Sequence, residues 1–388
     1  MPFYHKLGEM PKKRHTQFKK PDGKLYREEV MGLEGFASIQ SVLYHHFLPP
    51  RIKEVELLGS AKPEYAEFGA IRHRAYETES VSAGGDAVAA RKILMGNNDV
   101  TLGVSRPTES MDYFYRNSQA YECWFVHEGS GTLHSQFGKL EFSEGDYVVI
   151  PFGTTWKMDL AKGCARFFVV ETPSEIEPPS RYVNKVGQLL EHAPYTERDV
   201  RVPEELETHT ERGDFEVRVK VRDTISRHIL DHHPLDVVGW DGYLYPWIFN
   251  INDFQPITGA VHLPPPIHQT FKGRNFVLCS FVPRLYDYHP DAIPAPYNHS
   301  NVQSDEVIYY AEGEFMSRKT IDRADITLHP FGLPHGPQPG MTEASIGQKR
   351  TEELAVMVDT FHPLQVTKEA GEYEKTDYQD SWMEGDGE

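Results

Sequence analysis

The chain has 388 residues, 39% hydrophobic and 25% charged, and its formal net charge of −18 argues against nucleic acid or an anionic membrane as the main partner. No apolar run reaches the about 18 residues that a membrane span needs, and the basic N-terminus has no apolar stretch behind it that would make a secretory signal. Three cysteines in no close pair indicate a reducing, cytoplasmic setting, whereas 19 histidines favour a metal site of imidazole and carboxylate ligands over a thiolate one.

The sequence patterns along the chain predict a protein that consists mainly of β-strands. Helical periodicity is weak, and its best short candidates are residues 28–48 and 183–191. Residues 142–153 have the pattern of a turn, a strand and a second turn, and residues 166–171 and 354–359 have that of buried strands. The 30 glycines and 28 prolines are spread along the whole chain, between short runs of Val, Ile, Phe and Tyr. We therefore expect an all-β fold.

Two spaced frames occur twice along the chain, in the same order. In the first, a tyrosine or histidine precedes an asparagine, a glutamate and a glycine; its copies are Tyr115, Asn117, Glu122 and Gly129, and His299, Asn301, Glu306 and Gly313. In the second, a proline and a glycine precede a tryptophan or histidine; its copies are Pro151, Gly153 and Trp156, and Pro330, Gly332 and His335. The chain is therefore interpreted as a duplicated β unit. Both frames resemble the two motifs of the cupin superfamily, which implies a bicupin of two antiparallel jelly-roll β-barrels with an N-terminal extension.

At the ligand positions that this resemblance implies, the second copy has His299, Glu306 and His335. Glu306 lies seven residues after His299, an odd step that would place it on the opposite strand face, so a turn or bulge within residues 301–305 must bring it round. Two imidazoles and one carboxylate form the ligand set of non-haem Fe(II) oxygenases, with zinc or manganese as alternatives. The first copy keeps Glu122 but has tyrosine and tryptophan in place of the histidines, and we expect it to bind no metal.

Three further stretches narrow the resemblance to the homogentisate 1,2-dioxygenase family. Residues 236–250 begin Asp-Val-Val-Gly-Trp and resemble a D-V-V-G-W-x-G stretch of that family. Residues 296–301 resemble its P-Y-Y-H-R-N motif, and residues 328–337 resemble its L-H followed by P-H-G-P. The loop between the first histidine and the glutamate is one residue longer here. The similarity covers nearly the whole chain and is strongest over 236–340.

The resemblance implies metal ligands, catalytic residues and substrate contacts. The ligands of Fe(II) are His299, Glu306 and His335, the catalytic residues are His262, Tyr297 and His329, and the substrate contacts are His335, Arg318 and Phe315. His262 is the proton acceptor, a task that suits imidazole at neutral pH. Phe315 replaces a family tyrosine and cannot donate a hydrogen bond, whereas Arg318 replaces a lysine and can bind a carboxylate with two hydrogen bonds.

The implied reaction is Fe(II)-dependent ring cleavage of homogentisate with O2 to maleylacetoacetate, in tyrosine, phenylalanine or related aromatic catabolism. Two alternatives stay open: a ring-cleaving dioxygenase for another hydroquinone or hydroxybenzoate, such as gentisate, and a non-dioxygenase metal-binding bicupin. The expected partners are a small aromatic acid, O2 and further copies of the chain, in a homo-oligomer that is a trimer or hexamer.

The expected organisation has five segments. An N-terminal extension that packs on the barrels covers 1–75, a degenerate metal-free barrel 76–180, a connecting segment with strands 181–255, the catalytic Fe(II) barrel 256–365, and an acidic C-terminal tail 366–388. The last several residues of that tail are expected to be mobile, because they are strongly acidic and poor in apolar side chains.

Overall fold

A computed structural model describes residues 3–67, 69–315 and 317–383, and in these ranges nearly all regular structure is β, which confirms the predicted fold class. The helical elements are short: α1 (Met341–Ser345) and the 3-10 turns η1 (Thr78–Ser80), η2 (Ser180–Tyr182), η3 (Glu197–Asp199), η4 (Ile251–Asp253), η5 (Pro265–His268), η6 (Glu369–Glu372) and η7 (Tyr378–Trp382). None of the described helices is long and apolar enough to cross a membrane. The mobility expected at the end of the tail concerns residues 384–388, which lie outside the described ranges.

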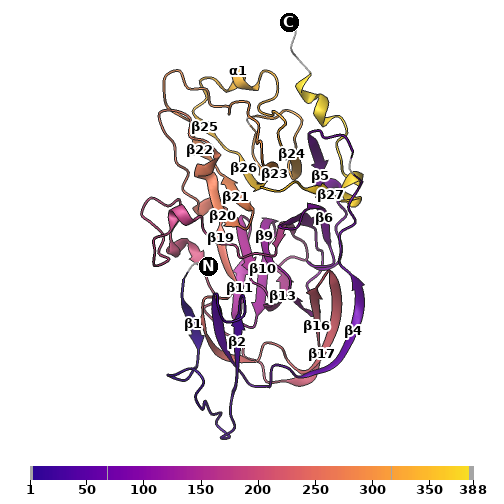
Figure 1. Cartoon of the computed structure of the whole chain (residues 1–388), viewed down its shortest axis with the longest axis vertical. Coiled ribbons are helices and arrows are strands. Elements are labelled where there is room, and N and C mark those ends of the chain that lie inside the picture. The colour runs from indigo at the N-terminus through magenta and orange to yellow at the C-terminus, as the bar shows by residue number, and fades with distance from the viewer. Residues whose placement is uncertain (1–2, 68, 316, 384–388) are drawn as a thin grey trace.

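Two sheets face each other and enclose the core of the N-terminal barrel, in the middle of the molecule (Figure 1). The eight-stranded sheet has the order β15 (Val200–Arg201), β19 (Trp247–Asn250), β12 (Asp146–Ile150), β9 (Tyr121–Glu128), β14 (Arg166–Thr172), β7 (Thr101–Ser105), β6 (Arg91–Gly96) and β27 (Gln365–Val366). The seven-stranded sheet has the order β11 (Gly138–Phe142), β10 (Gly131–Ser135), β13 (Thr155–Leu160), β8 (Phe114–Asn117), β16 (Arg212–Val221), β17 (Thr224–His232) and β4 (Ile52–Ser60). Large buried side chains from both sheets, Trp124, Trp156 and Phe167 among them, fill the space between them. The strands predicted within 142–153 and 166–171 are β12 and β14.

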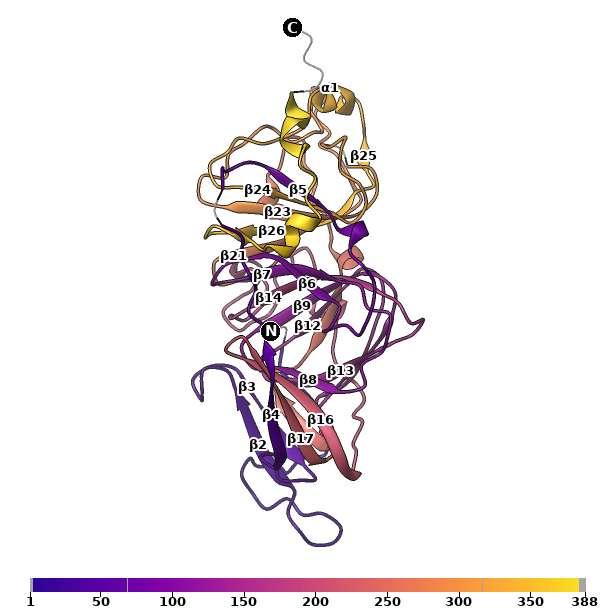
Figure 2. The same ribbon diagram turned by 90° about the vertical axis from the view of Figure 1, so that its right-hand side faces the viewer.

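A six-stranded sheet forms the C-terminal unit, at the top of Figure 2. Its order is β20 (Gln269–Gly273), β21 (Phe276–Phe281), β26 (Leu354–Thr360), β23 (Asp305–Glu312), β24 (Asp325–His329) and β5 (Arg74–Glu77), and β22 (Arg284–Leu285) pairs with β25 (Arg350–Thr351) beside it. The sheet packs on the eight-stranded one, where Tyr309 stacks on Phe168 with ring centroids 5.0 Å apart. Side chains alternate along a strand, so Val307 and Tyr309 of β23 face this packed core, while Glu306 and Ile308 line the cavity on the other side.

The N-terminal segment is tied to three sheets. Its first strands build a four-stranded sheet of order β1 (His5–Gly8), β18 (Val237–Gly242), β3 (Gln40–His45) and β2 (Arg27–Gly32). Next, β4 adds the last strand to the seven-stranded sheet, and β5 crosses to the C-terminal unit and pairs with β24. Figure 2 shows β5, in purple, among the orange and yellow strands of that unit. Residues far apart in the sequence therefore meet around one sheet.

Both helical candidates are wrong. Residues 28–48 contain β2 and β3, which pair antiparallel with Val30 opposite Val42. Pairing of β3 with β18 on its other side buries nearly all of that strand, and this tertiary packing outweighs the weak helical periodicity. Residues 183–191 form a turn that is closed by a β-bridge between Val183 and Leu189.

Candidate metal centre

Glu306 enters the site near the start of β23, directly after a turn. Val302 and Gln303 form this turn, which confirms the predicted change of direction between the first histidine and the glutamate. The carboxylate of Asp305 fixes the start of the strand because it accepts backbone N–H groups, including that of Phe331 at 2.8 Å. The alternation of β23 then directs the next side chain, Glu306, into the cavity.

His299 and His335 are brought together by backbone pairing. The amide of each donates to the carbonyl oxygen of the other, at 2.8 and 2.9 Å, and their ring centroids are 4.3 Å apart. Each Nδ1 lies next to a carbonyl oxygen two residues earlier, that of Tyr297 at 3.3 Å and that of Leu333 at 3.1 Å. Because a carbonyl oxygen can only accept, both Nδ1 atoms carry the hydrogen, and both Nε2 atoms offer a lone pair.

The three predicted ligands converge on one point. The Nε2 atoms of His299 and His335 lie 3.6 and 3.5 Å from the carboxylate oxygens of Glu306, and one ligand atom from each residue lies within 4.8 Å of the others. Within the described residues, Nε2 of His335 is buried and has no hydrogen-bond partner, as expected of an atom that binds a metal. Burial opposes ionisation of Glu306, but the surrounding imidazoles hold its pKa well below the usual range. An anionic carboxylate and two imidazoles with free Nε2 atoms fit a divalent metal ion.

His329 lies behind the triad and does not belong to the cavity wall. It is fully buried, its ring stacks on that of His335 with centroids 4.5 Å apart, and its Nδ1 lies 2.8 Å from Oε1 of Glu306. Burial lowers the pKa of His329 to about 3, so the ring is neutral. The structure thus places this predicted catalytic histidine next to the ligand carboxylate, where it orients Glu306.

Three donors from distant segments hold the loop that carries His335. Nε2 of His73, which precedes β5, lies 3.1 Å from the carbonyl oxygen of Pro334. Arg318 and Trp382 both donate to the carbonyl oxygen of Gly336, at 2.6 and 3.3 Å. Sequence reasoning identified neither His73 nor Trp382, since no local pattern connects these positions with the motif histidines.

Arg318 is a buried cation on the wall of the cavity. Its Nη1 donates to the carbonyl oxygens of Ser317 and Gly336, and the guanidinium lies 5.6 Å from the ring centre of Trp382. Its buried Nε has no hydrogen-bond partner within the described residues. Carbonyl dipoles, the hydroxyl groups of Tyr310 and Tyr378 and the more distant charge of Glu306 only partly balance its full charge, so Arg318 favours an anion in the cavity.

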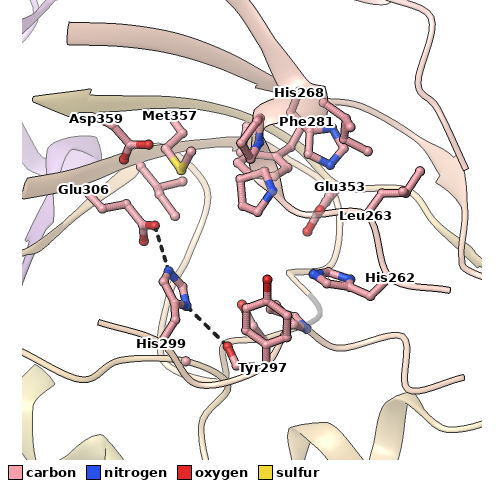
Figure 3. Close-up of a pocket in the computed structure, with 18 of the residues that line it drawn as sticks. His262, Leu263, His268, Phe281, Tyr297, His299, Glu306, Glu353, Met357 and Asp359 are labelled. Carbon is pink, nitrogen blue, oxygen red and sulfur yellow. Dashed lines mark hydrogen bonds and ion pairs between the residues drawn. The ribbon is translucent and has the colours of Figure 1, made fainter. Parts of the chain in front are cut away.

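The cavity in front of the triad has a volume of about 560 Å³. Apolar side chains from the open face of the sheet form its floor; they are Val277, Phe281, Ile308, Ala355 and Met357. In Figure 3, Glu306 and His299 lie on one side of this space, and His262, Leu263 and Glu353 lie on the other. Phe315, a predicted substrate contact, is not part of the wall; it packs behind Tyr310 with ring centroids 4.7 Å apart.

His262 and Tyr297 lie together on the wall of the cavity (Figure 3). Their rings meet edge to face with centroids 4.8 Å apart. Nδ1 of His262 lies 3.5 Å from a carboxylate oxygen of Asp287, and Nε2 has no hydrogen-bond partner within the described residues. The carboxylate favours the tautomer with hydrogen on Nδ1, which leaves Nε2 able to accept a proton.

Asp359 is a further acidic residue of the site, and sequence reasoning missed it. It lies on β26 directly opposite Glu306 of β23, and both side chains line the cavity, as Figure 3 shows. Burial and the charge of Glu306 raise the pKa of Asp359 well above its usual value. The predicted strand 354–359 contained the signal, because Ala355 and Met357 share the face of Asp359.

In the N-terminal barrel, the position that corresponds to Glu306 belongs to a buried network of charges. Oε1 of Glu122 accepts hydrogen bonds from Arg91 at 2.7 Å and from Asn117 at 3.1 Å. Arg91 also pairs with Glu171, to which Lys220 donates at 2.6 Å. A guanidinium therefore balances the carboxylate charge in this copy of the repeat.

Comparison with known proteins places the chain in a family. A family profile described as homogentisate 1,2-dioxygenase N-terminal matches residues 89–251. A protein of Saccharolobus solfataricus named "Putative dioxygenase SSO1533" is 42% identical over 386 residues, which cover 98% of this chain and 99% of that protein. The homogentisate 1,2-dioxygenase of Bradyrhizobium diazoefficiens is 27% identical over 299 residues, which cover 71% of this chain and 64% of that enzyme.

Among solved structures, a cupin 2 conserved barrel domain protein from Leptotrichia buccalis aligns with 70% of this chain and 89% of its own, at 9% identity and a TM-score of 0.30. The paired barrels and the histidine–carboxylate triad define a bicupin. The chain belongs to the homogentisate dioxygenase family.

Proposed function

We propose that the protein is an Fe(II)-dependent ring-cleaving dioxygenase that converts homogentisate and O2 to maleylacetoacetate, in tyrosine, phenylalanine or related aromatic catabolism. The observation that carries the proposal is the convergence of two elements on one cavity. These are the ligand triad of His299, Glu306 and His335, and the buried, incompletely paired guanidinium of Arg318. Family membership supports the class of reaction.

The cavity would bind an aromatic acid at three points. Arg318 would pair with the carboxylate, which could not otherwise enter a largely apolar cavity without a large desolvation cost. The ring would lie on the apolar floor near Met357 and Ile308. A phenolic oxygen would face the triad, so that the reacting groups are held in one orientation, which accounts for much of the acceleration expected of such a site.

Proton transfer would use His262. Its Nε2 has no partner within the described residues, and Asp287 lies next to its Nδ1. Nε2 can therefore accept the phenolic proton, and the resulting imidazolium is stabilised by the carboxylate. Bound Fe(II) would supply open coordination positions for the phenolate and O2, and the redox chemistry of ring cleavage.

A second candidate substrate is another hydroquinone or hydroxybenzoate acid. Phe315, which replaces a family tyrosine, packs on Tyr310 and offers no hydrogen bond to a substrate. The curated homogentisate 1,2-dioxygenase from Bradyrhizobium is matched over only 64% of its length, so its substrate does not transfer by similarity alone.

The test is oxygen uptake by the Fe(II)-loaded protein with a panel of acids: homogentisate, gentisate, salicylate and unsubstituted hydroquinone. We expect uptake equal to the loss of homogentisate, with a ring-opened product. Uptake with a different acid alone would change the substrate and keep the reaction. If no member of the panel supports uptake by protein with stoichiometric iron, ring cleavage is wrong.

A further inference from the structure

Glu306, His329 and Tyr378 form a chain of hydrogen bonds that begins at the triad and ends in the C-terminal segment. Nδ1 of His329 lies 2.8 Å from Oε1 of Glu306, and Nε2 lies 3.0 Å from the hydroxyl oxygen of Tyr378. All three side chains are buried. Tyr378 is the first residue of η7, more than forty positions beyond the last motif histidine.

The direction of these hydrogen bonds follows from the donors and acceptors. The carboxylate of Glu306 can only accept, so Nδ1 of His329 carries the hydrogen. A second hydrogen on the ring would place a buried cation against His335 and next to a site that fits a divalent metal, which is costly. Nε2 therefore offers its lone pair, and the hydroxyl of Tyr378 donates to it.

This arrangement gives the two oxygens of Glu306 different neighbours. Oε1 accepts from His329 and lies 3.5 Å from Nε2 of His335, whereas Oε2 lies 3.6 Å from Nε2 of His299. A carboxylate held at one oxygen presents the other in a fixed direction, and such supporting hydrogen bonds raise metal affinity. If the hydroxyl of Tyr378 were absent, Nε2 of His329 would lose its donor, and the ring that holds Oε1 would be fixed at one nitrogen only.

We propose that Tyr378 is a positioning residue that acts through His329 on Glu306, so that the C-terminal segment completes the metal site. The inference rests on the metal-binding part of the proposed function and is independent of the substrate. The hydroxyl of Tyr378 lies 3.0 Å from Nε2 of His329 and next to the guanidinium of Arg318, and it reaches Glu306 only through the ring behind the triad.

Other contacts hold η7 in place without this hydroxyl. Trp382 donates to the carbonyl oxygen of Gly336, and its ring lies 5.1 Å from that of His73. Gln338 donates to the hydroxyl of Ser381 at 2.7 Å. Replacement of Tyr378 by phenylalanine keeps the ring that packs on Trp382 and removes one donor, so it separates positioning from packing.

The experiment measures Co²⁺ binding to the metal-free full chain, by dissociation constant and visible absorption spectrum. We expect Tyr378→Phe to weaken binding by about tenfold or more, the scale reported for such supporting contacts, and to alter the spectrum. Tyr245→Phe is the matched control, because Tyr245 is also buried and donates to the carbonyl oxygen of Phe3 at 2.7 Å, outside the site. This control should bind Co²⁺ within about twofold of wild type.

A double-variant comparison tests the route through His329. In a His329→Leu background, Tyr378→Phe should change the dissociation constant by less than about twofold, because the intermediate is gone. The proposal would be overturned if Tyr378→Phe lowered Co²⁺ affinity as much in the His329→Leu background as in the wild type. It would also be overturned if Tyr378→Phe alone had the affinity and spectrum of the wild type. Where metal-free Tyr378→Phe does not fold, the release rate of Co²⁺ from protein purified with the metal makes the same comparison. Failure of the wild type itself to bind Co²⁺ would instead refute the metal site.

Discussion

Glu306 and Glu122 occupy matching positions of the repeat, and their substitution tests whether Glu306 binds metal while Glu122 does not. We expect Glu306→Ala to lower Fe(II) affinity at least about tenfold, because the variant loses the anionic ligand of the triad. Stoichiometric iron and full activity in this variant would contradict the triad.

Glu122→Ala should leave the iron content unchanged but lower the melting temperature, because Arg91 loses a buried partner at 2.7 Å. Loss of half the iron in that variant would show that the first barrel binds metal.

Arg318→Ala tests the anchor for the substrate carboxylate. We expect KM for homogentisate to rise, or kcat/KM to fall, by a factor of about ten or more, which is about 1.4 kcal/mol. Iron should be retained, because His73 and Trp382 still hold the loop that carries His335 after Arg318 is lost. Hydroquinone, which lacks the carboxylate, is the internal control, and its kcat/KM should not change. An equal loss with both compounds would indicate that Arg318 only supports the loop.

At the scale of single residues, the sequence predicted which three side chains converge, because His299, Glu306 and His335 stand in two spaced frames that recur along the chain. Asp359 could have been found from strand alternation, since it follows Ala355 and Met357 on one face. Tyr378 and His73 could not have been found from the sequence in this way. They lie in segments near opposite ends of the chain, and only the tertiary fold brings them to the site. Repeated local patterns identified the three converging side chains, whereas the residues that surround them depend on the complete fold.

At the scale of elements, His45 of β3 pairs with carboxylates of β2 and of the segment before β18. These ion pairs make the free energy of unfolding depend on pH. The two ring nitrogens of His45 lie 2.7 Å from Asp236 and 3.0 Å from Glu29. Burial opposes the charge, but these two carboxylates outweigh it and raise the pKa of His45 from 6.5 to about 9. A shift of this size corresponds to stabilisation on the order of 3 kcal/mol.

The sign of the effect follows from the raised pKa. The folded protein binds the proton more tightly, so the stabilisation is complete below about pH 6.5 and is lost as the pH rises through about 9. We expect the urea midpoint of the wild type to fall between about pH 6 and pH 10, and His45→Gln to lose most of this fall. His15→Gln is the control, because His15 pairs with Glu28 while its own side chain is 98% exposed, where ion pairs contribute little. An unchanged pH profile in His45→Gln would contradict the assignment.

The sequence showed where strands occur more readily than it showed which strands pair with each other. The runs at 166–171 and 354–359 form β14 and β26, because short continuous apolar stretches suit strands inside a sheet. Residues 28–48 were predicted as a helix, since the sequence does not show that β3 lies between β2 and β18. Propensity over so short a segment is weak compared with the burial that sheet pairing provides.

At the scale of the whole molecule, the duplicated architecture was predictable but its connections were not. The repeat indicated two barrels, while β5 and η7, from opposite ends of the chain, both join the C-terminal unit. Nothing in the composition of the acidic tail shows that Trp382 contacts the loop of His335 and that Tyr378 contacts the histidine behind the triad. Long-range contacts of this kind follow from the path of the chain, which local patterns do not encode.

The outer strand β4 bears on how copies of the chain assemble. The resemblance implies a homo-oligomer, and the structure offers a surface that would suit one: β4 is the outer strand of the seven-stranded sheet, and Val55 and Leu57 on it are 65% and 67% exposed. An outer strand with exposed aliphatic side chains favours pairing with a further chain, because pairing satisfies backbone groups and buries apolar surface. We expect a mass above that of one chain in light scattering, and Leu57→Lys should lower it. Val186→Lys, at a 77% exposed position in the turn within 183–191, should have no effect. A monomeric wild type with full activity would contradict this prediction, whereas an oligomer that Leu57→Lys leaves intact would place the interface elsewhere.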